Sequence, residues 1–161
     1  MSKTTTTNNI ELNISSKKEY TINGDKEKVI KLNPNDMGIV ARTSDAIAMI
    51  NELEEKYRNL FTSEEPTDDD LASFTAQFKE IDAGLREAVN FLFDYDVCSV
   101  CAGDGSMLDP QDGEYRYAVI INTLMTLYQD TISKETDKLI ATMKKKVDKY
   151  VNNDHKRKRT K

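Results

Sequence analysis

Hydrophobic and polar positions alternate near the start of the chain, which is typical of half-buried β-strands. The alternating apolar residues form three short runs, which are Ile10, Leu12 and Ile14, then Tyr20 and Ile22, then Val29, Ile30 and Leu32. Asn23-Gly24 lies between the second and third runs, and both residue types tolerate the positive φ angles of a tight hairpin turn. We therefore predict a small β-hairpin or meander over residues 10–32, preceded by a polar disordered arm at 1–9.

The hydrophobic period changes to that of a helix after residue 35. The polar segment 33–36, which contains Pro34, is a typical helix start. We expect this helix to break or bend near 43–45 and then to present one apolar face, made of Ile47, Ile50, Leu53, Tyr57 and Leu60. The acidic segment 63–70 is predicted to be a hinge whose aspartates stabilise the N-terminus of the next helix.

The most regular pattern in the chain is a seam of apolar residues at alternating spacings of three and four. The seam consists of Leu71, Phe74, Phe78, Ile81, Leu85, Ala88 and Leu92. This spacing predicts a long helix that packs against other helices with slight supercoiling. We expect the seam to lie in the core of the domain; the alternative is that it binds a partner protein.

The last third of the chain is predicted to be a loop followed by two helices. Glycines and Pro110 indicate a loop at 94–114, after which the helical period returns at Tyr117. Ser133 is expected to begin the last helix, which carries a shorter apolar stripe made of Leu139, Met143, Val147 and Tyr150. The pattern stops there and predicts a basic disordered tail at 151–161. The predicted fold is thus mainly α, a helical bundle with a small N-terminal β-hairpin, in which residues 10–150 form one domain and 35–150 its helical region.

The composition of the chain limits the classes of protein to which it can belong. The 161 residues are 38% hydrophobic and 32% charged, which indicates one domain with a thin core. No run approaches the roughly 18 apolar residues of a membrane helix, and no apolar core follows the N-terminus as in a signal peptide. We therefore expect a cytosolic protein with no membrane partner, and exclude a surface enzyme or a pump.

The charge is divided unevenly along the chain. Residues 134–161 contain 11 Lys/Arg and 4 Asp/Glu, a net charge of +7, whereas residues 1–133 contain 12 and 24, a net charge of −12. Such asymmetry favours contact with oppositely charged surfaces and allows homo-oligomers in which the body of one copy meets the basic end of another. The basic tail lacks interleaved aromatic residues, so we do not expect a nucleic-acid partner.

Candidate reaction chemistry is sparse. His155 is the single histidine and lies in the predicted tail, where no second group can orient it as a base. The chain has no Gly-rich phosphate loop and no nucleophile elbow. The acidic loop 104–114 fails as a calcium loop because Leu108 or Gly113 occupies a ligand position in either register. We expect no enzyme activity, no cofactor and no metal site.

Cys98 and Cys101 form a CxxC pair that allows three interpretations. A zinc site needs four ligands, so two chains would have to share the ion. A redox pair should open a helix after a buried strand, and no such strand precedes Cys98. The favoured interpretation is two small, partly buried thiols on a short helical turn.

A series of short motifs follows in order from residue 20 to residue 150. They are Tyr20-Thr21-Ile22-Asn23-Gly24-Asp25, Val29-Ile30-Lys31-Leu32-Asn33 with Asp36, Ile81-Asp82, Leu85-Arg86, Val89-Asn90-Phe91-Leu92-Phe93, Val97-Cys98-Ser99-Val100, Asp112-Gly113-Glu114-Tyr115-Arg116-Tyr117 and Lys149-Tyr150. In this order they resemble the tail assembly chaperone proteins of phages and prophages of Gram-positive bacteria. The arm before Ile10 and the end after Tyr150 lie outside the resemblance.

The resemblance implies a small, mostly helical, non-catalytic protein in the cytoplasm of the host bacterium. Such proteins are thought to coat the tape measure protein, keep it soluble and recruit tail tube protein. Helix-in-groove packing suits this role, and we hypothesise that Leu139, Met143, Val147 and Tyr150 bind the partner. The alternatives are a phage protein that binds and inhibits a host or defence component, and a structural tail or connector subunit. A further alternative is that the stripe belongs to the core.

Overall fold

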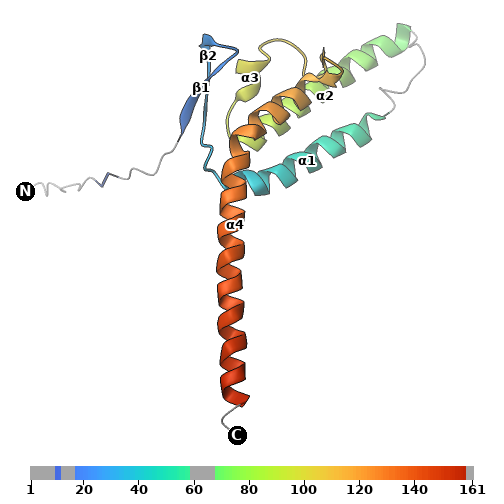
Figure 1. The fold of residues 1–161 in the computed structure, drawn as a ribbon. Helices are drawn as coiled ribbons and strands as arrows, with labels where there is room; N and C mark the ends of the chain where they lie inside the picture. Colours follow the sequence, from blue (N-terminus) through green and yellow to red (C-terminus); the bar gives the residue numbers. More distant parts are fainter. Residues whose placement is uncertain (1–9, 12–16, 59–67, 159–161) are drawn as a thin grey trace, which may run out of the picture.

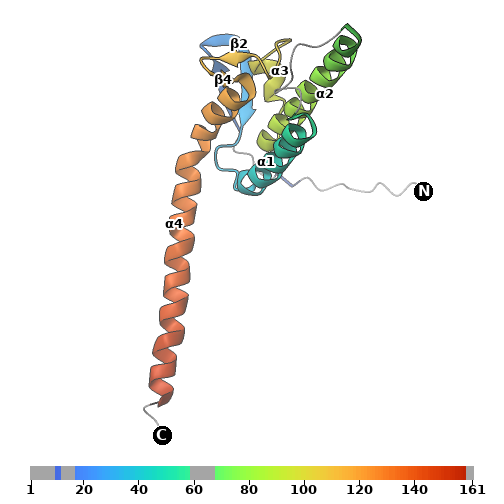
Figure 2. The same cartoon turned by 90° about the vertical axis from the view of Figure 1, so that its right-hand side faces the viewer.

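The computed structural model describes residues 10–11, 17–58 and 68–158 and shows a mainly helical protein (Figure 1). Its elements in chain order are β1 (Lys18–Ile22), β2 (Asp25–Leu32), α1 (Gly38–Lys56), α2 (Asp68–Phe93), α3 (Val97–Cys101), β3 (Pro110–Gln111), β4 (Glu114–Tyr115) and α4 (Arg116–Lys158). The predicted mainly α fold with an N-terminal β-hairpin is confirmed. The hairpin and the first three helices form a body with the start of α4, from which the rest of α4 projects (Figure 2).

Strands β1 and β2 form the N-terminal antiparallel hairpin, with Tyr20 opposite Ile30. Asn23 and Gly24 both have positive φ angles, as a two-residue hairpin turn requires. Ile30 and Leu32 are buried in the core, which holds the strand against α3. The additional strand predicted at 10–14 is not found at its described end, because Ile10 lies outside any strand and is 79% exposed. Leu12 and Ile14, like the arm at 1–9, lie outside the described residues.

The sequence predicts a break or bend near 43–45, but helix α1 is continuous there and has no break. The Thr43 hydroxyl donates a hydrogen bond to the Ile39 carbonyl oxygen (2.7 Å), and this internal partner lets the polar residue stay in the helix. The Arg42 side chain forms an ion pair with Asp36 and donates to the Leu92 carbonyl oxygen (2.9 Å). These contacts join the start of α1 to the end of α2, and the two helices run antiparallel side by side (Figures 1 and 2).

The apolar seam of α2 is only partly core. Its C-terminal members Ile81, Leu85, Ala88 and Leu92 are buried, as predicted. At the other end, Leu71 and Phe74 are 55% and 37% exposed. The reason is length, because α2 has 26 residues and its antiparallel neighbour α1 has 19. The first turns of α2 therefore extend beyond the helix that covers the rest of the seam.

Gly84 sets the spacing between α1 and α2. A Cβ atom at this position would lie 2.8 Å from both methyl carbons of Leu53. We expect Gly84→Leu to lower the free energy of unfolding by about 1–3 kcal/mol, because the larger side chain overpacks the helix contact. Urea unfolding would measure this loss, with Ala83→Leu at the neighbouring exposed position as the control. Equal stability of the two variants would show that the spacing does not depend on Gly84.

Helix α4 is a single helix of 43 residues, so the predicted start of a separate helix at Ser133 is wrong. No glycine or proline follows Gly113, and nothing in the sequence therefore breaks the helix. For the same reason the helix continues past Tyr150 to Lys158, where the sequence analysis predicted a disordered tail. Residues 159–161 lie outside the described part of the chain.

Candidate functional site

Among the described side chains of α4, those that belong to the core lie in its first part. Ile120, Leu124 and Tyr128 are buried, and Ile132 is partly buried against the same cluster. Every side chain that the structure describes from Ser133 to Lys145 is exposed. The 30 residues from Gln129 to Lys158 correspond to about 45 Å of helix beyond Tyr128, the last of the described α4 side chains that is buried. We call residues 129–158 the projecting segment, and it is the candidate functional site.

Tyr128 anchors the root of the projecting segment. Its side chain is 1% exposed, and the centroid of its ring lies 6.2 Å from the ring centroid of Phe93, at the end of α2. Burial raises the pKa of Tyr128 to about 12, so the phenol stays neutral. The direction in which α4 leaves the body is thus fixed by a packed aromatic contact.

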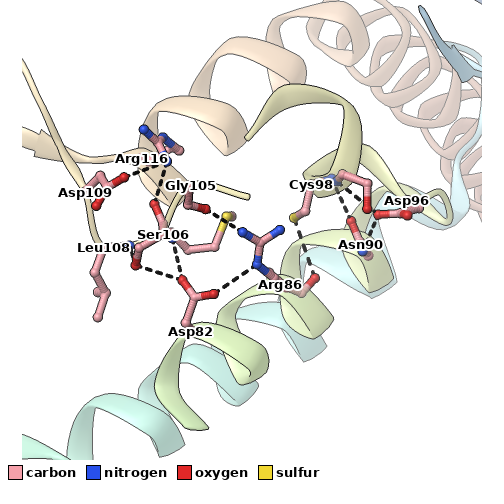
Figure 3. A network of polar contacts seen from close by, with 12 residues as sticks. Asp82, Arg86, Asn90, Asp96, Cys98, Gly105, Ser106, Leu108, Asp109 and Arg116 are labelled. Carbon is pink, nitrogen blue, oxygen red and sulfur yellow. Dashed lines mark hydrogen bonds and ion pairs between the residues drawn. The ribbon is translucent and has the colours of Figure 1, made fainter. Parts of the chain in front are cut away.

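A polar row on α2 fixes the loop that leads into α4 (Figure 3). Asp82, Arg86 and Asn90 are spaced by four residues, which places them on one helix face. One Asp82 carboxylate oxygen accepts hydrogen bonds from the Ser106 hydroxyl (2.9 Å) and the Met107 amide, and the other pairs with the Arg86 guanidinium (3.0 Å). Burial acts to raise the pKa of Asp82, but these hydrogen bonds outweigh it, and the pKa lies below its usual value.

Arg86 and Asn90 continue this row towards α3. Arg86 also donates to the Gly105 carbonyl oxygen (Figure 3). The Asn90 side chain accepts from the Cys98 amide (3.0 Å) and donates to Asp96 (2.9 Å), the residue that caps α3. The segment predicted as a loop at 94–114 therefore contains an ordered short helix and the β3–β4 hairpin. Each polar side chain of the row has a partner within this segment.

Arg116, the first residue of α4, closes the network. Its guanidinium pairs with Asp109 (2.8 Å) and donates to the Ser106 carbonyl oxygen (2.9 Å). The next amide, that of Tyr117, donates to the Met107 carbonyl oxygen (3.0 Å). A continuous set of contacts thus connects α2, through Ser106 and Met107, to the first turn of α4.

Cys98 and Cys101 lie on α3, the short helical turn that the sequence predicts for them. Cys98 is buried and Cys101 is half-buried. Burial raises the pKa of both thiols, that of Cys98 to about 12, so neither is activated as a thiolate. Among the described residues, no three or more His, Cys, Asp or Glu side chains lie together in a way that could hold a metal ion.

A groove lies between α1, α2 and the start of α4, with a cavity volume of about 490 Å³. Leu53, Ile81, Leu85 and Leu108 give it apolar walls, and the polar residues Glu54, Glu55, Arg58, Tyr115 and Tyr117 also line it. The rings of Tyr115 and Tyr117 stack with their centroids 6.1 Å apart. The Tyr117 hydroxyl donates a hydrogen bond to a Glu54 carboxylate oxygen (3.3 Å). No pattern within one segment of the sequence predicts this groove, because its walls come from four separate segments.

The predicted partner-binding residues Leu139, Met143, Val147 and Tyr150 occupy positions on the projecting segment. At 100° per residue, these four positions and those of Tyr128 and Ile132 fall within an arc of about 100°. The side of α4 that packs on the body therefore continues along the projecting segment as one apolar stripe. Their side chains lie outside the described part of the structure, and their binding role stays a prediction.

The projecting segment is also basic. Lys134, Lys138, Lys144 and Lys145 are exposed on it, and the chain carries seven further Lys/Arg from Lys146 onwards. No helix of the described residues combines the length and the apolar character needed to cross a lipid bilayer. The described lysines of this segment thus form a basic, exposed part of the helix, and the positions of the apolar stripe lie along one side of the same helix.

Comparison of this chain with protein-family models, curated proteins and solved structures finds no match.

Proposed function

We propose that this protein is a non-catalytic phage tail assembly chaperone that binds the tape measure protein and aids assembly of the tail tube. The proposal rests on the resemblance of its ordered motifs to that family and on the form of α4. It places the client-binding surface on the projecting segment, at Leu139, Met143, Val147 and Tyr150. The body would then serve to hold this helix in place.

The observation that carries the proposal is a long helix that leaves the core and whose described side chains from Ser133 to Lys145 are exposed. Beyond Ile132, the described side chains of α4 have no contact with the apolar core. An isolated helix gains little stability from its own hydrogen bonds, and helices in proteins are stabilised mainly by packing of an apolar face. A partner helix that covers the stripe supplies that packing. A long helical client offers such a surface repeatedly along its length.

The polar network of Figure 3 supports a structural use of the polar residues of the body. Asp82, Arg86, Asn90 and Arg116 all pair with groups of the same chain. These pairs position the loop and the first turn of α4. A binding protein whose body orients a projecting helix needs such a network.

Co-expression with a tape measure protein tests the proposal directly. We expect the client to move from the insoluble to the soluble fraction when the full chain is present, because its apolar helical face is covered. The two proteins should then co-purify through a tag on either one. A client that stays insoluble, or one that is soluble without co-purifying, would contradict the proposed function.

The composition of purified particles distinguishes a chaperone from a structural subunit. A chaperone of this kind is made in the infected cell and should be absent from finished particles or present in traces. Mass spectrometry of purified particles should therefore detect the tube protein in large excess over this chain. Stoichiometric copies in the particles would favour the alternative of a tail or connector subunit.

A further inference from the structure

We propose that the projecting segment of one copy docks in the groove of a second copy, so that the chain associates head to tail. This inference concerns the protein alone and goes beyond its proposed role as a chaperone. It rests on two surfaces of the same molecule, the groove with its apolar walls and the basic helix with its apolar stripe.

The groove has the chemistry of a site for an amphipathic helix. Half-buried Leu53 lines the groove, the buried residues Ile81 and Leu85 lie beneath it, and Tyr115, which is 44% exposed, offers an aromatic face at the edge. Helix-in-groove recognition uses apolar anchors spaced by three or four residues. The apolar stripe has this spacing, because its four members are separated by four, four and three residues: Leu139, Met143, Val147 and Tyr150. Their positions therefore lie on one side of the helix, as anchors for one groove require.

The two surfaces also carry opposite charge. Glu54 and Glu55 line the groove together with Arg58, which pairs with Glu55, so the groove keeps one excess negative charge. Residues 1–133 as a whole have a net charge of −12. The helix that carries the stripe exposes Lys144 and Lys145 between its anchors and has a net charge of +7 over residues 134–161. A pair of α4 helices from two copies would bring like charges together. Docking on the acidic body instead brings opposite charges together.

Docking within one copy is excluded by the geometry of α4. Tyr117, which lines the groove, lies in the first turn of the same helix, and Tyr115, which also lines it, directly precedes that helix. Leu139 is 22 residues further along, or about 33 Å, and Tyr150 is about 50 Å away along the helix axis. A continuous helix cannot fold its far half back onto its own start. The segment therefore reaches only the groove of another molecule.

The contact joins different surfaces of the two copies. Such heterologous contacts generate a ring if the rotation closes and an open helical filament if it does not. The same apolar stripe is assigned to the client in the proposed function. Self-association and client binding would then compete, and the stripe would be covered in both states.

Sedimentation velocity on the full chain, over a concentration series at low and high salt, tests the inference. We expect association at low salt that weakens at high salt, because screening reduces attraction between exposed charges. Glu54→Lys/Glu55→Lys in the groove, and separately Lys144→Glu/Lys145→Glu on α4, should each weaken association at least about tenfold. The variant with all four substitutions should recover association, because the charges are again opposite.

Two control variants reverse the same number and sign of charges at positions outside the groove and outside α4. Lys26→Glu/Lys28→Glu on the hairpin, and Glu27→Lys/Glu87→Lys on exposed positions of the body, should associate like the unmodified chain. Circular dichroism checks folding, and Glu54→Gln/Glu55→Gln replaces the groove variant if that variant unfolds.

A chain that stays monomeric throughout the series would overturn the inference. So would association that survives charge reversal in the groove, which would indicate pairing of α4 with another surface. Both results leave the co-expression test of the chaperone unaffected, because that test uses the client.

Discussion

Replacing Met143 and Val147 by aspartate is expected to abolish co-purification of the client while leaving the thermal unfolding of the protein nearly unchanged. Both positions lie on the stripe of the projecting segment, beyond Tyr128, where the described side chains from Ser133 to Lys145 are exposed. Loss of two apolar anchors at about 1.5–3 kcal/mol each predicts at least a hundredfold weaker binding. Surface substitutions away from the core usually change the free energy of unfolding by about 0.5 kcal/mol or less.

The matched control carries the same change in charge on the opposite side of the helix. Ala141→Asp/Asn152→Asp adds two aspartates whose positions lie roughly 120–180° from the stripe positions, and it should bind the client as the unmodified chain does. Pull-down and the unfolding midpoint are measured on both variants. A large drop in the unfolding midpoint of Met143→Asp/Val147→Asp would assign the stripe to the core. Equal loss of binding in both variants would show that charge, and not the stripe, decides recognition.

Local sequence signals were sufficient for the N-terminal hairpin and for much of the core. Asn23-Gly24 identified the turn because both residues accept positive φ, and both adopt it. The three–four spacing identified α2, and its members from Ile81 to Leu92 are buried. These features depend on neighbours in sequence, which a single chain displays directly.

Contacts between distant segments could not be predicted in this way. Asp82 and Arg86 have the spacing of an ordinary exposed helix face, yet their partners Gly105, Ser106 and Met107 lie about 20 residues or more away. Nothing in the spacing of one segment indicates the hydrogen bonds of another. The groove was missed for the same reason, because α1, α2 and the start of α4 each supply only part of its lining.

The two helix breaks that were predicted but not found have a common physical cause. The sequence predicts a break or bend at 43–45 and a helix start at Ser133, and both places contain a Ser or Thr, whose side chain can compete with the backbone for hydrogen bonds. Thr43 satisfies its hydroxyl within the helix, and Ser133 lies on an exposed surface where water is available. Without a glycine or proline beside them, such residues do not end a helix. The length of α4, and with it the projecting segment, follows from this point.

Asp82→Ala is expected to lower the free energy of unfolding by about 2–4 kcal/mol, the largest effect we predict for a single substitution. The carboxylate accepts two hydrogen bonds from the 106–107 segment and pairs with Arg86. Hydrogen bonds to a charged group contribute about 1.5–3 kcal/mol, and the Met107 amide would be left without its partner. Urea unfolding measures the loss. Hydrogen exchange should also quicken at residues 103–117, because Asp82 holds this segment against α2.

The low pKa of Asp82 predicts how this effect depends on pH. A carboxyl group whose pKa is lower in the folded state stabilises the fold above its unfolded pKa of about 3.9, and this contribution is lost as the pH falls through the folded value. The difference in free energy of unfolding between the unmodified chain and Asp82→Ala should therefore have its largest value at neutral pH and become smaller below about pH 4. Asp104→Ala, an exposed aspartate in the same loop, is the control and should stay within about 0.5 kcal/mol of the unmodified chain at every pH. A stability difference for Asp82→Ala that is small at neutral pH, or that grows as the pH falls, would show that the start of α4 is held by Arg116 and the core alone.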